Sequence, residues 1–180
     1  MPAGAAAETL AKSTFKSDTE NWKVEAGAGG DREDPDHVAT GGSPGGFVQI
    51  VDQTDGVAFW RAPAEFRGNQ GGAFKGTLEW AWQQSATDNG FFDVDVILEG
   101  GAQQLTLDVP DVPPATPFWG EVAVQLKPAG WEDSTVLPLT PATKRDMKNV
   151  LSDVEELKIR AEHRTGEDTD GLDSVFLRSG

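Results

Sequence analysis

Two aspartates two positions apart, Asp93 and Asp95, form the residue pair whose types and spacing most directly suggest catalysis. On a β-strand such residues point to the same face, and two strand rises separate them by about 7 Å, within the range of glycosidase carboxylate pairs. Two aspartates on the solvent-exposed face of an ordinary, non-catalytic strand would have the same spacing. Because the chain has no cysteine, no tyrosine and only two histidines, bases and nucleophiles are scarce. We expect a protein that is not an enzyme, with a glycan-active hydrolase or lyase as the alternative.

A literal match to the nucleophile motif G-x-S-x-G occurs at residues 41–45. The residue after Ser43 is Pro44, which has no backbone N–H to contribute to an oxyanion hole. The motif therefore predicts a turn. His37, in the acidic run just before it, is more typical of a loop histidine than of a ligand.

The stretch EDTDGLD at residues 167–173 partly imitates an oxygen-rich calcium loop. It lacks the glutamate that closes an EF-hand, so it does not predict one. Asp173 lies where the final strand is expected to start. At that place a carboxylate can brace a turn or bind a hard cation, and the residues leave both open.

Six tryptophans are many for 180 residues, and sugar rings stack on exposed aromatic faces. The alternation of residues 73–83 places Trp80 and Trp82 in the core. Trp60 follows Phe59 and could point to either side. Trp119 and Trp131 border Pro/Gly-rich loops and are the better candidates for exposed ligand-binding residues.

Short segments with period-2 alternation, separated by turns, predict an all-β fold. We expect a two-sheet antiparallel β-sandwich of jelly-roll type, with one short α-helix before the last two strands. Thr140 and Pro141 offer a helix start, and apolar residues from 147 to 154 recur at helical spacing. We expect strands at residues 15–24, 47–52, 57–61, 73–83, 93–99, 103–109, 119–127 and 157–161, and a final strand that contains Leu172, Val175 and Leu177. A hairpin turn is expected at 53–56, a connection through Gly100 and Gly101 between 93–99 and 103–109, and a long surface loop at 25–46.

Four segments, in order, resemble the laminin IV type A (laminin B) domain family: GGFVQIVDQTDGVAFWRAPAEFRGN, DVDVILEGGAQQLTL, WEDS and IRAEHRTGEDTDGLDSVFL. The resemblance covers roughly residues 15–178. Two departures are Gly71 to Phe74, where the family usually has Tyr-Gly-Gly, and His163, where it usually has tyrosine. Both departures affect inherited aromatic binding contacts.

The resemblance implies a jelly roll similar to carbohydrate-binding modules, in which a structural calcium commonly bridges the first and last strands. It implies Asp173 as the first calcium ligand, with Asp18 and Asp52 as partners. It also implies an extracellular binding or scaffold module that contacts a glycan or a protein. A self-assembling structural protein, extracellular or filamentous, with homo-oligomers formed through edge strands or the N-terminal tail, is a further alternative.

Thirty acidic and fifteen basic residues give a net charge of −15, which repels nucleic acid. The sequence contains no apolar run long enough to span a membrane. Glu8 interrupts the N-terminal apolar residues, so we expect no signal peptide in this sequence. The length fits one domain at residues 14–180, preceded by a tail at residues 1–13.

Overall fold

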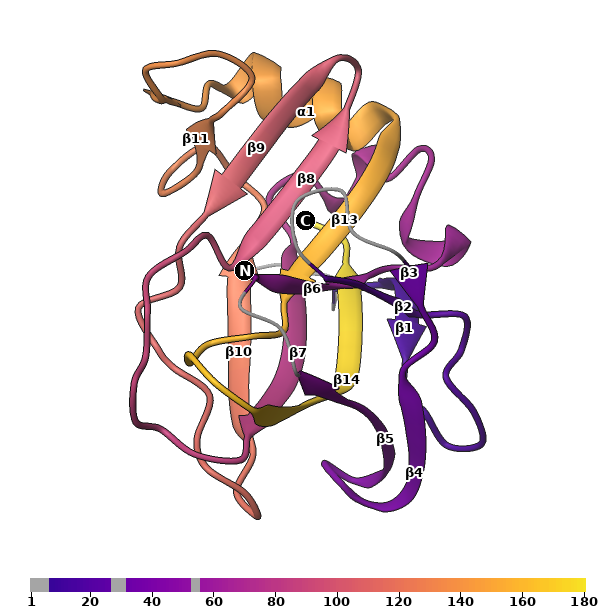
Figure 1. Ribbon diagram of the computed structural model, residues 1–180. Coiled ribbons are helices and arrows are strands. Elements are labelled where there is room, and N and C mark those ends of the chain that lie inside the picture. The colour runs from indigo at the N-terminus through magenta and orange to yellow at the C-terminus, as the bar shows by residue number, and fades with distance from the viewer. Residues whose placement is uncertain (1–6, 27–31, 53–55) are drawn as a thin grey trace, which may run out of the picture.

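The computed structural model describes residues 7–26, 32–52 and 56–180. Two antiparallel sheets pack face to face and enclose the core, as the jelly-roll prediction requires (Figure 1). A six-stranded sheet has the order β10-β7-β14-β5-β4 with β1 paired to β14, and an eight-stranded sheet has the order β12-β11-β9-β8-β13-β6-β2-β3. Within the described residues, no helix is sufficiently long and apolar to cross a membrane.

The strands of the six-stranded sheet are β1 (Thr9–Ser13), β4 (Asp36–Gly42), β5 (Gly45–Asp52), β7 (Thr77–Gln84), β10 (Gly120–Gln125) and β14 (Asp168–Arg178). Those of the eight-stranded sheet are β2 (Lys23–Ala26), β3 (Arg32–Glu33), β6 (Ala58–Arg61), β8 (Val96–Gly100), β9 (Gln103–Leu107), β11 (Glu132–Asp133), β12 (Thr140–Pro141) and β13 (Val154–Arg160). Two 3-10 turns, η1 (Ala64–Phe66) and η2 (Gly71–Ala73), and the helix α1 (Lys144–Ser152) complete the fold.

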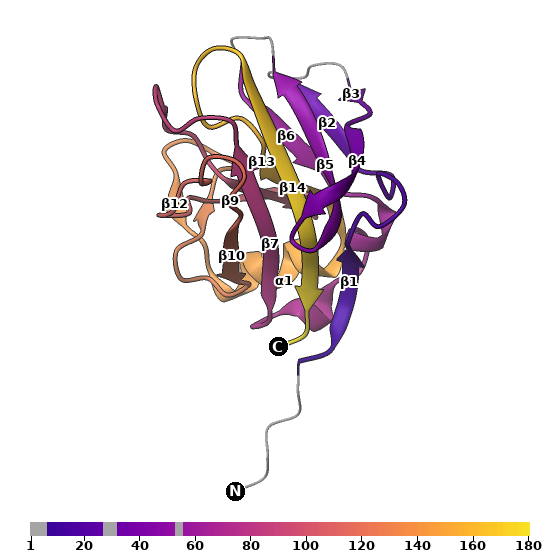
Figure 2. The same ribbon diagram turned by 90° about the horizontal axis from the view of Figure 1, so that it is seen from below.

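The first and last strands lie side by side, because β1 pairs with the C-terminal half of β14 (Figure 2). The predicted boundary between a tail and a domain at residue 14 is therefore wrong for residues 9–13, which belong to the sheet. Ala11 and Ser13 are buried there. An alanine-rich composition favours helix over strand, and pairing with a distant strand overrode that local preference.

Several local predictions fail where a partner from elsewhere in the chain decides the structure. The strand expected at 15–24 is mostly a turn, although Phe15 and Trp22 are fully buried and their rings are 6.2 Å apart. Part of the loop expected at 25–46 is β4, which pairs with β5. Its Ser43-Pro44 pair forms the connecting turn, as the G-x-S-x-G analysis predicted.

The hairpin expected around residues 53–56 does not form, because β5 and β6 belong to different sheets. Residues 53–55 lie outside the described part of the chain. The predicted hairpin of β8 with β9 does form, with its turn at Gly101-Ala102, one residue after the expected Gly100-Gly101. An Asp-Gly pair in the sequence predicts that the chain changes direction. Which strand then pairs with which depends on the packing of the whole sandwich.

The helix α1 begins three residues later than the Thr-Pro pair predicted. Thr143 is its N-cap and forms a capping box with Asp146, whose backbone N–H donates to the Thr143 hydroxyl at 3.2 Å. Met147, Val150 and Leu151 are buried, as their spacing predicted. Thr140 and Pro141 instead form the short strand β12.

Candidate functional site

An open cleft lies at one end of the eight-stranded sheet, where β8 begins and β9 and β13 end. We call it the loop cleft. It has a volume of about 710 Å³ and is lined by two facing segments, residues 90–95 and 108–112, together with Arg160 and His163. β8, β9 and β13 are neighbouring antiparallel strands, so these four pieces of chain meet at the same end of the sheet.

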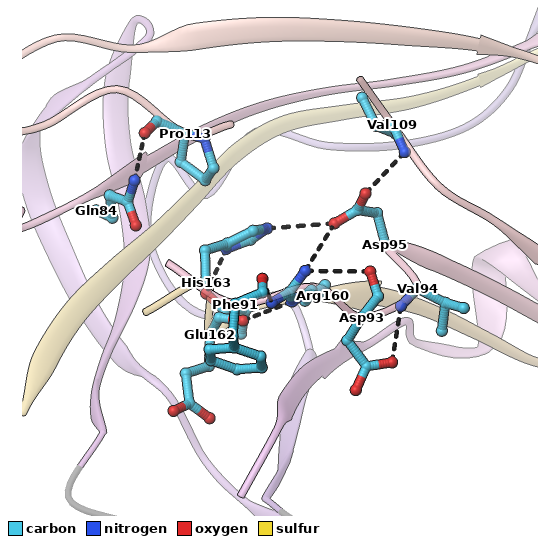
Figure 3. Close-up of polar contacts among 11 residues, drawn as sticks. Gln84, Phe91, Asp93, Val94, Asp95, Val109, Pro113, Arg160, Glu162 and His163 are labelled. Carbon is cyan, nitrogen blue, oxygen red and sulfur yellow. Dashed lines mark hydrogen bonds and ion pairs between the residues drawn. The ribbon is translucent and has the colours of Figure 1, made fainter. Parts of the chain in front are cut away.

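A buried ion pair between Asp95 and Arg160 forms the floor of the loop cleft (Figure 3). The Asp95 carboxylate lies 3.5 Å from the Arg160 guanidinium and accepts a 2.7 Å hydrogen bond from the Val109 backbone N–H. Their side chains are only 4% (Arg160) and 7% (Asp95) exposed. A buried carboxylate is tolerated when a cation and hydrogen-bond donors surround it, and Asp95 has both.

Arg160 also ties the 90–95 segment to β13. Its guanidinium donates to the backbone carbonyls of Phe91 at 2.8 Å and Asp93 at 3.1 Å, and its Nε donates to the Glu162 carbonyl at 2.6 Å. It also stacks over the Phe91 ring at 4.6 Å. Arg160 therefore supports one wall of the cleft with charge-assisted hydrogen bonds, which are stronger than neutral ones.

His163 completes the floor and lies between the two sheets. Its Nε2 is 3.5 Å from the Asp95 carboxylate, and its ring packs edge-on against Trp82 of β7 at 5.0 Å. Burial lowers the pKa of His163 below 6.5, against the opposing effect of Asp95. The imidazole is therefore neutral at pH 7.

The rim of the loop cleft combines carboxylates with exposed apolar side chains. Phe92 is fully exposed and Val112 is 70% exposed. Asp93, Asp108 and Asp111 lie near them, and partial burial together with the negative charges of Asp95, Glu132 and Asp93 raises the pKa of Asp108. The rim thus offers one free aromatic face and several hydrogen-bond acceptors.

The predicted pair Asp93 and Asp95 does meet in this cleft, but on different surfaces. The strand β8 begins only at Val96, so the i, i+2 rule for strands does not apply. Asp93 is exposed and accepts from the Val94 backbone N–H at 2.7 Å, whereas Asp95 is buried in the ion pair. The prediction that both carboxylates share one strand face is wrong.

Sequence reasoning missed Arg160 and His163 as parts of a site. Its alternation with the apolar residues Leu157, Ile159 and Ala161 predicts that Arg160 lies on the solvated face of a strand, whereas the structure buries it. The sequence signal that could have identified it is the cluster Arg160, Glu162 and His163 at the end of a strand. Three polar residues in four positions are more than a simple turn requires, so they indicate a polar site. The aspartate that pairs with Arg160, Asp95, is 65 residues earlier in the sequence.

Asp173, the first predicted calcium ligand, is in the middle of β14 and not at its start. It is completely buried and its carboxylate accepts hydrogen bonds from the backbone N–H groups of Ser43 and Ser174. It therefore fastens the β4–β5 turn to β14. Burial, the largest influence, raises the pKa of Asp173 to about 6.

The three predicted calcium ligands do not converge on one point. Asp52 pairs with Asp168, five residues along β14 from Asp173, or about 17 Å at the usual strand rise. Asp18 is exposed in a turn and accepts from the Glu20 N–H at 2.8 Å. In the described part of the chain, no three His, Asp or Glu residues are grouped so that they could hold a metal ion. The calcium ion itself stays a prediction, without a site made of these three residues.

The three predicted ligand-binding tryptophans have different surroundings. Trp60 and Trp131 are each 1% exposed, so neither can stack on a ligand, and their prediction as binding residues is wrong. Trp131 donates its indole N–H to the Gln125 carbonyl at 3.0 Å. Trp119 is half-buried: its N–H donates to the Gly41 carbonyl at 2.8 Å and its ring packs against Phe47 at 5.2 Å. It stays a candidate.

A two-sheet jelly roll with an open cleft at the loop end defines a class of small β-sandwich domains. A family model, Laminin B (Domain IV), matches residues 59–180, which is more than half of the chain. The chain belongs to this laminin B family, as its sequence motifs indicated.

Two laminins illustrate the relationship. Human laminin subunit alpha-1 is 25% identical over 126 residues, which cover 68% of this chain but only 4% of that protein. The L4b domain of human laminin alpha-2 superposes with a TM-score of 0.77 at 14% identity, covering 98% of this chain and all of that one. The chain therefore matches a small part of the length of laminin subunit alpha-1 and the full length of the alpha-2 L4b domain.

A carbohydrate-binding module shares the same fold. The family 11 module from Clostridium thermocellum, solved in complex with a β-1,3-1,4-mixed-linked tetrasaccharide, has a TM-score of 0.61 at 12% identity and covers 98% of both chains. At this identity the likeness shows the fold alone. It supports the jelly-roll architecture that the sequence predicted.

Proposed function

We propose that this domain is a non-catalytic, extracellular binding module that holds a neutral glycan in the loop cleft. The observation that carries the proposal is the exposed Phe92 ring above a rim of carboxylates. An apolar sugar face stacks on such a ring, while carboxylates accept hydrogen bonds from sugar hydroxyls. The extracellular location rests on membership of the laminin B family.

A neutral ligand fits the cleft better than an anionic one. Asp93, Asp108 and Asp111 lie at the rim, and the one cation of the floor, Arg160, is already engaged by Asp95 and by three carbonyl groups. A sulfated or uronic glycan would meet uncompensated negative charge. A mixed-linked β-glucan is a suitable first probe, because the family 11 module with this fold was solved with a fragment of one.

The surroundings of the aspartates favour binding over hydrolysis. Both Asp95 oxygens have partners, and its charge is balanced by Arg160. A glycosidase needs one carboxyl group free to donate a proton and a second free to attack or activate water. The glycan-active enzyme remains the alternative, and release of reducing ends that is lost in Asp93→Asn would support it.

Isothermal titration calorimetry with β-1,3-1,4-mixed-linked glucan oligosaccharides tests the proposal. Phe92→Ala should weaken binding about tenfold, equivalent to ~1.4 kcal/mol. Phe118→Ala is the matched control, because Phe118 is 70% exposed but does not line the loop cleft, and it should leave affinity unchanged. Heparin should not bind.

Two outcomes would contradict the proposed site. Equal affinity of Phe92→Ala and the parent protein would exclude the cleft, and loss of binding only in Trp119→Ala would move the glycan to the exposed face of the six-stranded sheet. Absence of binding to neutral glycans, together with retention of a protein from the extracellular matrix, would favour the protein-partner alternative. A sedimentation coefficient that rises with concentration would favour self-assembly.

The predicted structural calcium has its own test. If an ion stabilises the fold, EDTA should lower the melting temperature and excess calcium should restore it. Magnesium at the same ionic strength is the control for general screening of the acidic surface. Identical melting curves in EDTA and in calcium would reject the ion.

A further inference from the structure

The strand β10 has one unpaired edge. It is the last strand in the order of the six-stranded sheet and, among the described residues, pairs with β7 alone (Figure 1). Its register with β7 is unbroken from Gly120 opposite Trp82 to Gln125 opposite Thr77. The second edge of β10 is therefore straight over six residues, which favours the addition of a further strand.

The hydrogen bonds around β10 identify which backbone groups face that edge. In an antiparallel strand, both polar groups of one residue point to one side and those of the next residue to the other. Leu126 donates to the Gly76 carbonyl on the β7 side at 2.9 Å, whereas the Gln125 carbonyl accepts from Trp131 on the opposite side. The N–H and C=O groups of Glu121 and Ala123 therefore point away from β7.

A groove runs along this edge. It has a volume of about 280 Å³ and lies between β10 and residues 107–111, the segment that follows β9. The inner side is apolar, because Leu107, Val109, Val122, Val124 and Trp131 line it. Side chains that alternate along an added strand would thus meet an apolar surface on one face and solvent on the other.

The charged residues of the groove have one sign. Asp108, Asp111 and Glu121 line it, and no Lys, Arg or His does. Burial raises the pKa of Asp108, and the negative charges of Asp95, Glu132 and Asp93 raise it further. The whole chain carries −15. The groove therefore attracts cationic side chains.

We propose that the free edge of β10 binds an extended, basic peptide segment of a partner protein by strand addition. The partner backbone pairs with the outward groups of Glu121 and Ala123, its apolar side chains cover Val122 and Val124, and alternate lysine or arginine residues face the acidic rim. A second copy of this chain is a poor occupant, because it brings another −15 and a second acidic edge.

Fluorescence anisotropy with a labelled, capped peptide of alternating lysine and valine tests the proposal at low and physiological salt. The intact domain should bind it, with affinity falling as salt rises. A peptide of alternating lysine and proline has the same charge but cannot complete a strand ladder, and it should bind at least tenfold more weakly. Equal affinity for the two peptides would show that charge alone accounts for binding and would overturn strand addition.

Two substitutions at one position locate the contact. Ala123→Pro removes an outward N–H without breaking the pairing with β7, since proline is tolerated at such edge positions. It should weaken binding at least tenfold, whereas Ala123→Val, which keeps the N–H, should not. If Ala123→Pro fails to fold, the same alternating peptide methylated on its backbone nitrogens provides the comparison with the unchanged domain, and it should bind at least tenfold more weakly.

Further variants separate this site from the glycan cleft. Glu121 lines the groove but not the loop cleft, so Glu121→Gln should reduce peptide affinity several-fold, while Phe92→Ala should leave it unchanged. Peptide binding that is insensitive to Ala123→Pro would overturn the proposal whatever the glycan experiments give. A concentration-dependent dimer that Ala123→Pro abolishes would assign the edge to a second copy and would also overturn it.

Discussion

Asp95 and Asp173 are both buried carboxylates, one at the loop end of the eight-stranded sheet and one inside the six-stranded sheet. Asp95 faces the guanidinium of Arg160, whereas the partners found for Asp173 are the neutral backbone N–H groups of Ser43 and Ser174. The pKa of Asp173 is raised to about 6, because donors without charge only partly replace lost hydration. The comparison shows that one fold holds buried acids in two ways, with different responses to mutation.

The largest effect is expected when the cation beside Asp95 is removed. Arg160→Met leaves a buried, unpaired carboxylate and releases the carbonyls of Phe91 and Asp93, so the free energy of unfolding should fall by about 3–5 kcal/mol. Urea denaturation measures this loss. Arg164→Ala is the matched control, since its partner Asp88 is exposed, and it should cost less than about 1 kcal/mol. Equal costs for the two arginines would contradict the structural role of Arg160.

A smaller effect is expected at Asp173. Asp173→Ala leaves two partly buried N–H groups without their acceptor and should cost about 1–3 kcal/mol at pH 7. The pH dependence has a definite sign: the folded pKa of about 6 exceeds the ordinary 3.8, so the folded state binds more protons between these values. The stability of the parent protein relative to Asp173→Asn should therefore fall as pH rises from about 4 to 6.

The control for this titration is Asp18→Asn, because Asp18 is exposed. It measures how the loss of one exposed negative charge changes the free energy of unfolding across the same pH range. Denaturant titrations of the three proteins at closely spaced pH values provide the measurement. A parallel pair of curves for the parent and Asp173→Asn would show that Asp173 does not titrate near pH 6 in the folded state.

The smallest effect is expected at His163, with the opposite sign. Burial lowers its folded pKa below 6.5, so below pH 6.5 the unfolded chain binds more protons than the folded one. The stability of the parent protein relative to His163→Gln should fall as pH decreases from 6.5, by roughly 1 kcal/mol per pH unit at first. NMR titration of the His163 ring checks the pKa directly. A folded pKa above 6.5 would mean that Asp95 outweighs burial.

Much of the fold could be read from local patterns. The alternation in β7 correctly placed Trp80 and Trp82 in the core, and Gly100-Gly101 correctly marked the β8–β9 hairpin. These features depend on residues close in sequence, where periodicity and turn chemistry act directly. The family resemblance was confirmed for the same reason: its motifs are runs of adjacent strand and turn residues.

The candidate site was less predictable. Asp93 and Asp95 were identified, but their different burial depends on Arg160 and on the backbone of Val109. The exposed Phe92 was not selected, and the buried Trp60 and Trp131 were, because neighbouring prolines and glycines do not reveal what packs over a ring. Exposure is a property of the assembled sandwich.

By itself the sequence determined the jelly-roll class, the laminin B membership, the net charge of −15 and the positions of most of the longer strands, because alternation, turn residues and net charge are local or additive. Only the tertiary structure decided that Asp173 fastens a turn in mid-strand, that Arg160 neutralises Asp95, and that β10 presents a free edge. Each of these depends on which distant segments become neighbours, and strand pairing between distant residues is chosen by the packing of the whole core.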